Sequence, residues 1–476
     1  MDILNNHNGL YVDLYELTMA QGYFFAGKQD EPAAFDYFFR DNPFDGGYVI
    51  FAGLWNLLRS LEHFTFGSED IEYLRNQGFK EPFLEYLSTF QFKGTIDSVR
   101  EGEVVFPVEP VLRVAGNIVE CQLIETILLN YLNFESLVAT KASRIRRVAG
   151  ERPVSDFGLR RAQGLGGLQA SRAAVIGGVD ATSNVLAGFT YQAKITGTLA
   201  HSWVQSFGDE RTAFRKYAEV FPENTVLLVD TYNTLNQGVP NAIQVGHELQ
   251  EKGYRLQAIR LDSGDLAFLS KKARKMLDDA GLHETKILAS NQLDEYVIRS
   301  LLEQGAPIDG FGVGTELITG KKTAALDGVY KLSMNQHEPK LKLSDTFEKI
   351  SLPGVKKLFR YFDHAGLFYA DCIALEDEDH PEVIHHPYEI NKKCYLSGLR
   401  KEPLFERVFE NGRIILAEKS IADIQAYAKK RLAQLPVEHQ RFEMPHIYKV
   451  GLSDQLNNMR NKLVHQLKQK IEQKRR

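Results

Sequence analysis

Short polar clusters recur through the middle of this sequence, and each follows an apolar run of strand length. The clusters hold carboxylates, arginines, a histidine and glycines, which are groups for proton transfer, anion binding and tight turns. In chain order they are Asp156–Arg160, Asp180–Asn184, Gly197–His201, Asp230–Asn233, Arg260–Asp265, Ser290–Gln292 and Gly312–Thr315.

The histidine of this set is His201, which lies in the sequence Gly-Thr-Leu-Ala-His-Ser with Thr198 one helical turn before it. No HxH or HExxH pattern and no nearby cysteine accompanies it, which disfavours metal ligation. The roles left open are acid, base or covalent nucleophile, with a structural histidine as the alternative.

Two carboxylates, Asp230 and Asp262, end the fourth and fifth apolar runs. Such a pair can accept hydrogen bonds from ribose hydroxyls, help to hold Mg²⁺ or stabilise a positively charged transition state. The alternative is helix capping, which Asp230 and Ser263 could each perform.

The same clusters contain groups suited to an anion and to a planar ring. Arg160 and Arg260 can donate two parallel hydrogen bonds to a phosphate or carboxylate, although pairing with neighbouring acids is the alternative. Phe157 and Tyr15 can stack on a flat ring, although most aromatic residues belong to the core. Together these residues predict an anionic ribose-phosphate substrate and a flat heterocycle.

A glycine-rich run at Gly310–Thr315 allows backbone N–H groups to approach a phosphate closely. The dinucleotide fingerprint fails because its third glycine would fall on Leu317, and the spacing to Lys321 is one residue too long for a P-loop. A tight turn between a strand and a helix is the alternative.

The elements that must position these clusters are strands that alternate with helix-length segments. Apolar runs of this length are typical of strands buried on both faces of a parallel sheet. Because the clusters follow the strands, they converge on one face if the sheet closes, which favours an irregular α/β barrel of about seven strands over an open sheet. The expected strands are 153–157, 174–178, 193–197, 225–229, 256–261, 286–289 and 308–313, with helices over 210–220, 241–252, 266–279 and 294–304.

Three segments follow from these patterns. Residues 1–135 are predicted to be mixed α and β, 136–328 to form the α/β barrel with the active site, and 329–476 to contain strands and then helix. The first segment is expected to hold a helix over 13–25, a strand over 31–39, a helix over 54–61 and a small sheet over 94–118. An amphipathic helix is expected from Ser453 onward.

The composition limits the function classes. The 476 residues include 57 Lys and Arg against 62 Asp and Glu, a net charge of −5, which gives no general positive field for nucleic acid. Hydrophobic residues make up 43%, which argues against disorder. Cys121, Cys372 and Cys394 form no CxxC pair, which indicates a reducing, cytoplasmic compartment. The start of the sequence has no secretory pattern, and the longest uncharged apolar stretch, 46–58, is too short to span a membrane.

The motifs in and around these clusters resemble those of nicotinate phosphoribosyltransferases, and the likeness covers nearly the whole chain. The matching stretches are DLYELTMAQGY (13–23), FDYFFRDNPFDGGYVIFAGL (35–54), ATKASRIRRVAG (139–150), SDFGLRRAQG (155–164), ASRAAVIGGVDATSNVLAG (170–188), GTLAHSWV (197–204), LVDTYNTL (228–235), IRLDSGDL (259–266), GFGVGTELIT (310–319) and KLKLSDTFEKISLPG (340–354).

The resemblance implies the type II phosphoribosyltransferase fold, an irregular α/β barrel with a second domain built from N- and C-terminal segments. It implies that nicotinate and phosphoribosyl pyrophosphate give nicotinate mononucleotide and pyrophosphate in NAD biosynthesis. ATP is the expected co-substrate, and Mg²⁺ is expected to bind mainly through the substrate, with Asp230 and Asp262 as candidate contacts. A homodimer with sites at the subunit interface is also implied.

The resemblance assigns roles residue by residue. His201 matches the histidine that is transiently phosphorylated, and Thr198 and Tyr15 match positions near nicotinate. Arg260 matches the arginine that meets the pyridine carboxylate or the phosphates, and Asp230 and Asp262 match carboxylates around the ribose. The other implied substrate contacts are Phe157, Arg160, Asn291, Gly312, Gly314 and Thr315.

Two alternatives remain open from the sequence. An enzyme of the same fold that uses nicotinamide is one, because Asp180 is expected near the site and could accept a hydrogen bond from an amide NH₂. A non-catalytic ligand-binding homologue is the other, although every cluster retains chemically competent residues.

Overall fold

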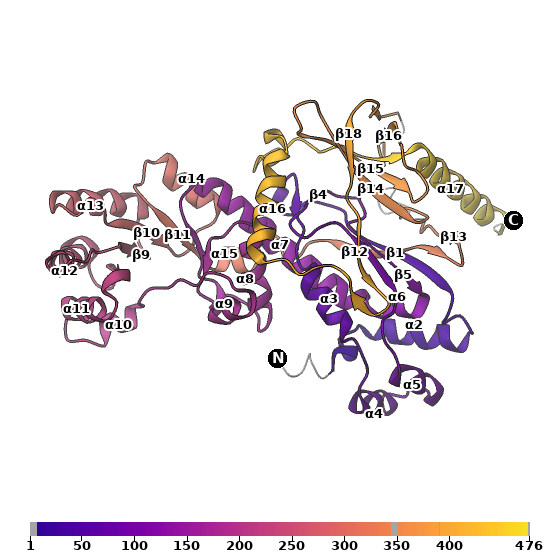
Figure 1. The fold of residues 1–476 in the computed structure, drawn as a ribbon, viewed down its shortest axis with the longest axis horizontal. Coiled ribbons are helices and arrows are strands. Elements are labelled where there is room, and N and C mark those ends of the chain that lie inside the picture. The colour runs from indigo at the N-terminus through magenta and orange to yellow at the C-terminus, as the bar shows by residue number, and fades with distance from the viewer. Residues whose placement is uncertain (1–6, 344–350, 390, 475–476) are drawn as a thin grey trace. The chain divides into compact units, whose positions relative to one another are not determined.

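A computed structural model describes residues 7–343, 351–389 and 391–474, so part of the predicted segment 340–354 lies outside the described residues. The chain forms two compact units (Figure 1). The first, the terminal unit, contains Met1–Leu137, Ala325–Lys419 and Ala426–Arg476. The second, the parallel-sheet unit, contains Val138–Ala324 and Ser420–Gln425. The chain passes between them within helices α7 (Glu125–Ala149) and α16 (Ile421–Gln434).

The terminal unit contains two larger sheets and a two-stranded ribbon. One sheet is antiparallel in the order β13-β12-β1-β5-β3-β19-β20, the other follows the order β17-β16-β21-β15-β14-β18, and β2 pairs with β4. Their bounds are β1 Pro32–Phe39, β2 Val49–Ile50, β3 Thr95–Ser98, β4 Val104–Val105, β5 Leu112–Asn117, β12 Gly328–Asn335, β13 Glu338–Pro339, β14 Lys356–Phe362, β15 Phe368–Leu375, β16 Val383–His385, β17 Lys393–Tyr395, β18 Arg400–Pro403, β19 Glu406–Glu410, β20 Arg413–Ile414 and β21 Val450–Ser453.

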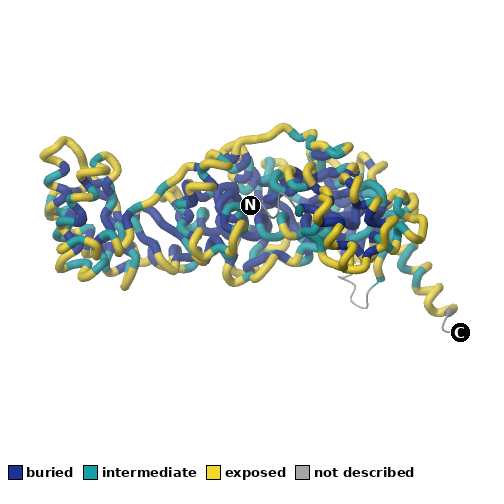
Figure 2. Tube along the Cα trace, turned by 90° about the horizontal axis from the view of Figure 1, so that it is seen from below, coloured by how far each residue is buried: buried dark blue, intermediate teal, exposed yellow. Residues whose placement is uncertain are grey.

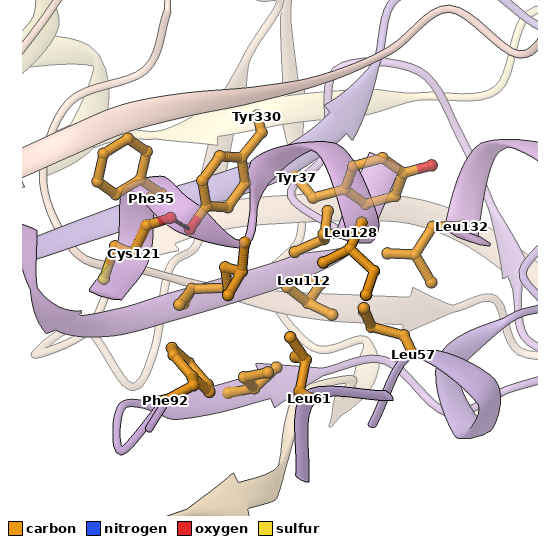
Figure 3. Packing of buried hydrophobic residues seen from close by; sticks show 14 of the residues in the cluster. Phe35, Tyr37, Leu57, Leu61, Phe92, Leu112, Cys121, Leu128, Leu132 and Tyr330 are labelled. Carbon is orange, nitrogen blue, oxygen red and sulfur yellow. Dashed lines mark hydrogen bonds between the residues drawn. The ribbon is translucent and has the colours of Figure 1, made fainter. Parts of the chain in front are cut away.

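Helices of the terminal unit supply the apolar face that covers these strands. Leucines such as Leu57 and Leu61 recur at helical spacing on one face of α3, and both are buried (Figure 3). Phe35 of β1 stacks on Tyr330 of β12 with ring centroids 4.8 Å apart, and the Tyr330 hydroxyl donates to the Cys121 carbonyl at 3.0 Å. The helices are α2 Leu14–Phe25, α3 Leu54–Glu62, α4 Ser68–Asn76, α5 Glu81–Ser88, α6 Ile118–Leu123 and α17 Asp454–Lys474, whose far end is exposed (Figure 2).

The parallel-sheet unit contains six parallel strands in the order β7-β6-β11-β10-β9-β8. A parallel bridge from Thr182 to Ile195 adds a seventh position beyond β7. The strands are β6 Val154–Asp156, β7 Ala181–Thr182, β8 Val226–Leu228, β9 Ala258–Leu261, β10 Lys286–Ser290 and β11 Gly310–Val313. Its helices are α8 Gly166–Ile176, α9 Val185–Tyr191, α10 His201–Gln205, α11 Glu210–Val220, α12 Val239–Glu251, α13 Leu266–Asp279, α14 Glu295–Glu303 and α15 Thr315–Ile318.

The fold class expected from the sequence is confirmed, as an irregular barrel-type parallel sheet and a mixed α+β unit built from both ends of the chain. Five of the seven expected strands are present, and the four helices predicted between them are α11 to α14. No helix within the described ranges is long and apolar enough to cross a membrane.

Two expected strands are wrong. The run 174–178 belongs to the end of α8 and the turn after it, where Gly177 approaches the Ala139 carbonyl so closely that a Cβ would lie 2.1 Å from the oxygen. A short apolar run has the same composition in a buried helix as in a buried strand, which explains the error. The run 193–197 contributes only the single bridge at Ile195.

Candidate active site

The predicted clusters share one edge of the parallel sheet because β6 and β8 to β11 all run in the same direction. Phe157, Asp230, Asp262, Asn291 and Gly314 each follow the carboxyl end of one of these strands within two residues. Sites in barrels of this kind are built at this edge, where residues from several strands meet.

His201 is the first residue of α10 and has two contacts across the sheet edge. Its Nδ1 atom lies 3.1 Å from the Thr231 hydroxyl, and its Nε2 atom lies 4.0 Å from Asp262 Oδ2. The imidazole is 40% exposed, so it remains accessible to a ligand. These contacts orient a partly open histidine between a hydroxyl and a carboxylate.

The two predicted carboxylates form a pair. Asp230 Oδ2 accepts hydrogen bonds from the Asp262 backbone N–H at 2.8 Å and from the Ser263 hydroxyl at 2.7 Å. Asp230 Oδ1 is buried and has no hydrogen-bond partner among the described residues. Asp262 accepts from the Ser290 hydroxyl through Oδ1.

Capping does not explain these carboxylates. Asp265 caps α13 by accepting from the Phe268 N–H at 3.0 Å, and Asn233 performs the same role for the π-helical turn Thr234–Gly238. The burial of an unpartnered oxygen on Asp230 costs free energy unless a ligand or ion completes it. This orphaned oxygen fits a ribose hydroxyl or a divalent cation.

Arg260 supplies the cation of the site. Its guanidinium donates to the Thr198 hydroxyl, lies 5.9 Å from the Phe157 ring centroid and retains a buried Nε without a partner in the described chain. Burial lowers the pKa of Arg260, while Asp262 and Asp230 oppose that shift. A guanidinium is fully protonated at neutral pH in either case, so its charge is available to an anionic substrate.

The Phe157 ring is placed by the glycine-rich run. A Cβ on Gly312 would lie 2.4 Å from Cδ2 of Phe157, so only glycine allows the ring to pack against β11. The Phe157 N–H also donates to the Val313 carbonyl at 2.8 Å. Gly312 therefore allows the Phe157 ring to pack on β11, and its backbone contact with a phosphate stays a prediction.

Of the remaining predicted residues, some have contacts at the sheet edge and others do not. Asn291 has a φ of 74° and donates to the Asp262 carbonyl at 2.9 Å, so it braces the carboxylate pair. Gly314 and Thr315 begin α15, and Arg160 is exposed and close enough to Arg260 to influence it electrostatically. Tyr15 belongs to α2 of the terminal unit, so its place at the site stays a prediction.

Asp180 does not belong to this edge. Its carboxylate accepts from the Val154 N–H at 2.7 Å and pairs with Arg146 at 2.7 Å, and Val154 begins β6 rather than ends it. The strand expected at 174–178 is absent, so Asp180 does not follow the carboxyl end of a strand as the sequence predicted. The feature that favoured an amide-bearing ring is therefore removed.

Three of the four hydroxyl groups described next were not singled out from the sequence, and the fourth, that of Ser263, was considered only as a helix cap. Thr231 contacts His201, Ser263 contacts Asp230, Ser290 contacts Asp262, and Ser171 donates to the buried Asp156 at 2.8 Å. Thr231, Ser263 and Ser290 lie within the predicted clusters, so the sequence indicated that they are close to the site. It did not indicate which side chain each of them contacts.

Comparisons with known proteins identify the family of this chain. The models of the nicotinate phosphoribosyltransferase N-terminal domain, family and C-terminal domain match residues 10–133, 153–361 and 355–460. A nicotinate phosphoribosyltransferase of Bacillus subtilis is 43% identical over 98% of this chain and 96% of its own length. This chain belongs to the nicotinate phosphoribosyltransferase family.

Other members of the nicotinate phosphoribosyltransferase family extend the comparison. The human nicotinate phosphoribosyltransferase is 34% identical over 95% of this chain and 96% of its own length. A crystal structure of human nicotinic acid phosphoribosyltransferase superposes with a TM-score of 0.86 over 95% of this chain and 99% of that chain. A nicotinate-nucleotide pyrophosphorylase structure from Pyrococcus furiosus, 23% identical with a TM-score of 0.72, shares the fold.

Proposed function

We propose that this protein is an ATP-coupled nicotinate phosphoribosyltransferase. It joins nicotinate to phosphoribosyl pyrophosphate and releases nicotinate mononucleotide and pyrophosphate, a step of NAD biosynthesis or salvage. The observation that supports this most strongly is the full-length membership in a family of that name, combined with the His201, Asp230, Asp262 and Arg260 arrangement at one sheet edge.

The proposed roles follow from the contacts. Arg260, with Thr198 as its partner, meets the carboxylate of nicotinate or a phosphate, and the Phe157 ring stacks on the pyridine. Asp230 and Asp262 hold the ribose and stabilise the positive charge that develops at its anomeric carbon as pyrophosphate leaves. Mg²⁺, with oxygens of Asp230 and Asp262 as its candidate protein contacts, would neutralise the leaving pyrophosphate.

His201 is the proposed acceptor of the ATP γ-phosphoryl group. A carboxylate beside Nε2 favours the proton on that nitrogen, which leaves the lone pair on Nδ1 beside the Thr231 hydroxyl. Attack on the γ-phosphorus then forms a P–N bond and releases ADP. The added negative charge would reorganise the anion pocket around Arg260 and couple ATP cleavage to product formation.

The remaining parts of the proposal concern organisation. The segments 1–135, 136–328 and 329–476 are the proposed domain divisions, with the outer two forming one domain. We also propose a homodimer in the cytoplasm, with no nucleic-acid or membrane partner; the three free cysteines agree with a reducing compartment. Arg160, Asn291, Gly312, Gly314, Thr315 and Tyr15 complete the proposed substrate contacts.

Labelling with γ-³²P-ATP tests the role of His201. The wild-type protein should acquire an acid-labile label, and His201→Ala should acquire none while retaining weak transfer that ATP does not stimulate. His247→Ala, which changes an exposed histidine on α12, is the matched control and should label normally. ATP stimulation that survives in His201→Ala would refute the assignment.

The nicotinamide alternative has lost its structural support because Asp180 is engaged with Val154 and Arg146. The guanidinium of Arg260 at the sheet edge matches a ring carboxylate better than a neutral amide. A non-catalytic homologue would bind both substrates without turnover, which a product assay separates.

A further inference from the structure

A second cationic pocket lies within the terminal unit, on residues that the proposed reaction does not use. It is a cavity of about 570 Å³ between β18, the start of β19, the last turns of α16 and the turn after β3. A volume of this size is typical of a small-molecule site. Its charged lining residues are Arg100, Arg400, Glu402, Glu406, Lys430 and Arg431.

The charges of this lining do not balance. Each carboxylate already has a partner from the lining, since Glu402 lies 2.6 Å from Arg431 Nη2 and Glu406 lies 3.2 Å from Arg100 Nε. Arg400 and Lys430, in contrast, have no carboxylate partner among the described residues. Two uncompensated positive charges remain in the pocket of a protein whose net charge is −5.

Buried groups hold the floor of the pocket rigid. The Arg431 side chain is 6% exposed, and its Nε donates to Glu103 Oε1 at 2.8 Å. Glu103 also pairs with Arg360 at 2.6 Å and accepts from the Tyr427 hydroxyl. A buried guanidinium fixed from behind differs from flexible surface lysines, because its position is set before any ligand arrives.

Aromatic rings shape the same pocket. Arg400 lies 3.7 Å from the centroid of the Phe362 ring, and Arg431 lies 5.8 Å from that centroid. The contact with the Phe362 ring therefore holds the Arg400 guanidinium in place. Phe405 and Tyr427 line the pocket as well and offer planar surfaces to a ring.

We infer that this pocket binds a phosphate-bearing anion of up to nucleotide size. Phosphate groups meet Arg400 and Lys430, while Arg431 stays paired with Glu402 and Glu103 at the floor of the pocket, and a planar base contacts Phe405 or Tyr427. No residue of the pocket belongs to the proposed active site, so the inference stands apart from the proposed function.

Calorimetric titration with ADP, and separately with inorganic pyrophosphate, tests this site on the full-length protein. The wild type should show two classes of ADP sites, one at the proposed active site and one in the pocket. Lys430→Glu, which leaves the Arg400–Phe362 contact in place, should weaken the second class at least tenfold, and Arg400→Ala/Lys430→Ala should abolish it. Arg260→Ala should weaken only the first class.

The control is Arg413→Ala/Lys429→Ala, which removes two exposed cations outside the pocket lining and should leave both classes unchanged. Pyrophosphate that competes as well as ADP would assign the site to phosphate groups alone. A single class of ADP sites in the wild type, or equal affinities in Lys430→Glu and the wild type, would overturn the inference. Transfer from phosphoribosyl pyrophosphate to nicotinate in the absence of ATP and ADP should be unchanged in Lys430→Glu, which separates this outcome from a failure of the proposed function.

Discussion

Single side chains at the sheet edge divide into those proposed to contact ligand and the hydroxyl groups that hydrogen-bond to them. His201, Asp230, Asp262 and Arg260 are chemically competent types, which is why the sequence alone could predict them. Their hydroxyl partners could not be assigned in the same way, because Thr231 and Ser290 come from strands other than those of their partners. Which hydroxyl faces which acid depends on strand order and register.

Thr231 tests this division at the residue scale. Thr231→Val removes the hydroxyl 3.1 Å from His201 Nδ1, and a lost hydrogen bond of about 1 kcal/mol corresponds to a rate reduction of roughly fivefold. We expect ATP-coupled turnover and His201 labelling to fall by about that factor, while transfer without ATP is unchanged.

Thr231→Ser restores the hydroxyl and should recover most of the labelling. Rapid-quench measurement of labelled protein in the three forms provides the comparison. Equal labelling rates in Thr231→Val and the wild type would show that Thr231 does not orient the histidine.

Among the elements of the parallel-sheet unit, apolar strands followed by a polar cluster were predictable, whereas β7 and the end of α8 were not. β9, β10 and β11 are four or five residues long, apolar and followed by polar clusters, so their pattern is distinctive. β7 has only two residues, too few to show any periodicity, and the apolar end of α8 beside it was mistaken for a strand. Because a strand was predicted at 174–178, Asp180 was expected at the carboxyl end of a strand, where it does not lie.

The Phe157 ring packs on strand β11, and a substitution that adds a methyl group at Gly312 tests this contact. Gly312→Ala would place Cβ 2.4 Å from the ring, so the ring must move away from β11. We expect the KM for nicotinate to rise about tenfold and the free energy of unfolding to fall by about 1–3 kcal/mol, the usual cost of overpacking. Gly208→Ala is the control, since Gly208 lies outside the predicted clusters and a Cβ there meets nothing within 4 Å.

Steady-state kinetics and urea unfolding of both variants measure these effects. An unchanged KM in Gly312→Ala would mean that the position of the Phe157 ring does not matter for nicotinate.

Helix α2 contains a buried carboxyl that should make stability depend on pH. Glu16 Oε1 accepts from the Thr126 N–H at 3.0 Å, Oε2 has no partner in the described chain, and burial raises the pKa of Glu16 to about 8. The folded protein therefore retains a proton that the unfolded chain loses near pH 4.3. The contribution of Glu16 to the free energy of unfolding therefore falls as the pH rises from about 4.3 to about 8.

Glu16→Gln keeps an acceptor for Thr126 and removes this titration. Relative to the wild type, its free energy of unfolding should be larger at pH 8.5 than at pH 5.5 by on the order of 3 kcal/mol. Glu85→Gln, an exposed position on α5, should show no such difference. Urea unfolding at the two pH values measures both, and parallel pH profiles for Glu16→Gln and the wild type would contradict the account.

At the scale of the whole molecule, each unit exposes apolar side chains that its own fold leaves uncovered. Leu14 on α2 is 66% exposed, and Phe189 on α9 is 79% exposed. Val185 and Leu186 of α9 are exposed beside Phe189, and a contiguous apolar patch of this kind, unlike a single exposed residue, supports the proposed homodimer.

Light scattering should give twice the chain mass of 54.0 kDa, and Phe189→Glu should shift the protein toward the monomer. Lys272→Glu, on the exposed face of α13, is the matched charge control and should leave the mass unchanged. A wild-type mass of one chain would exclude the dimer.

The central claim is that this chain transfers a phosphoribosyl group to nicotinate with ATP coupling. Pyrophosphate release by the purified protein tests it most directly, with phosphoribosyl pyrophosphate, Mg²⁺ and either nicotinate or nicotinamide, each with and without ATP. The account predicts release with nicotinate that ATP strongly enhances and little release with nicotinamide. Release only with nicotinamide, or none with either ring while both substrates bind, would contradict it.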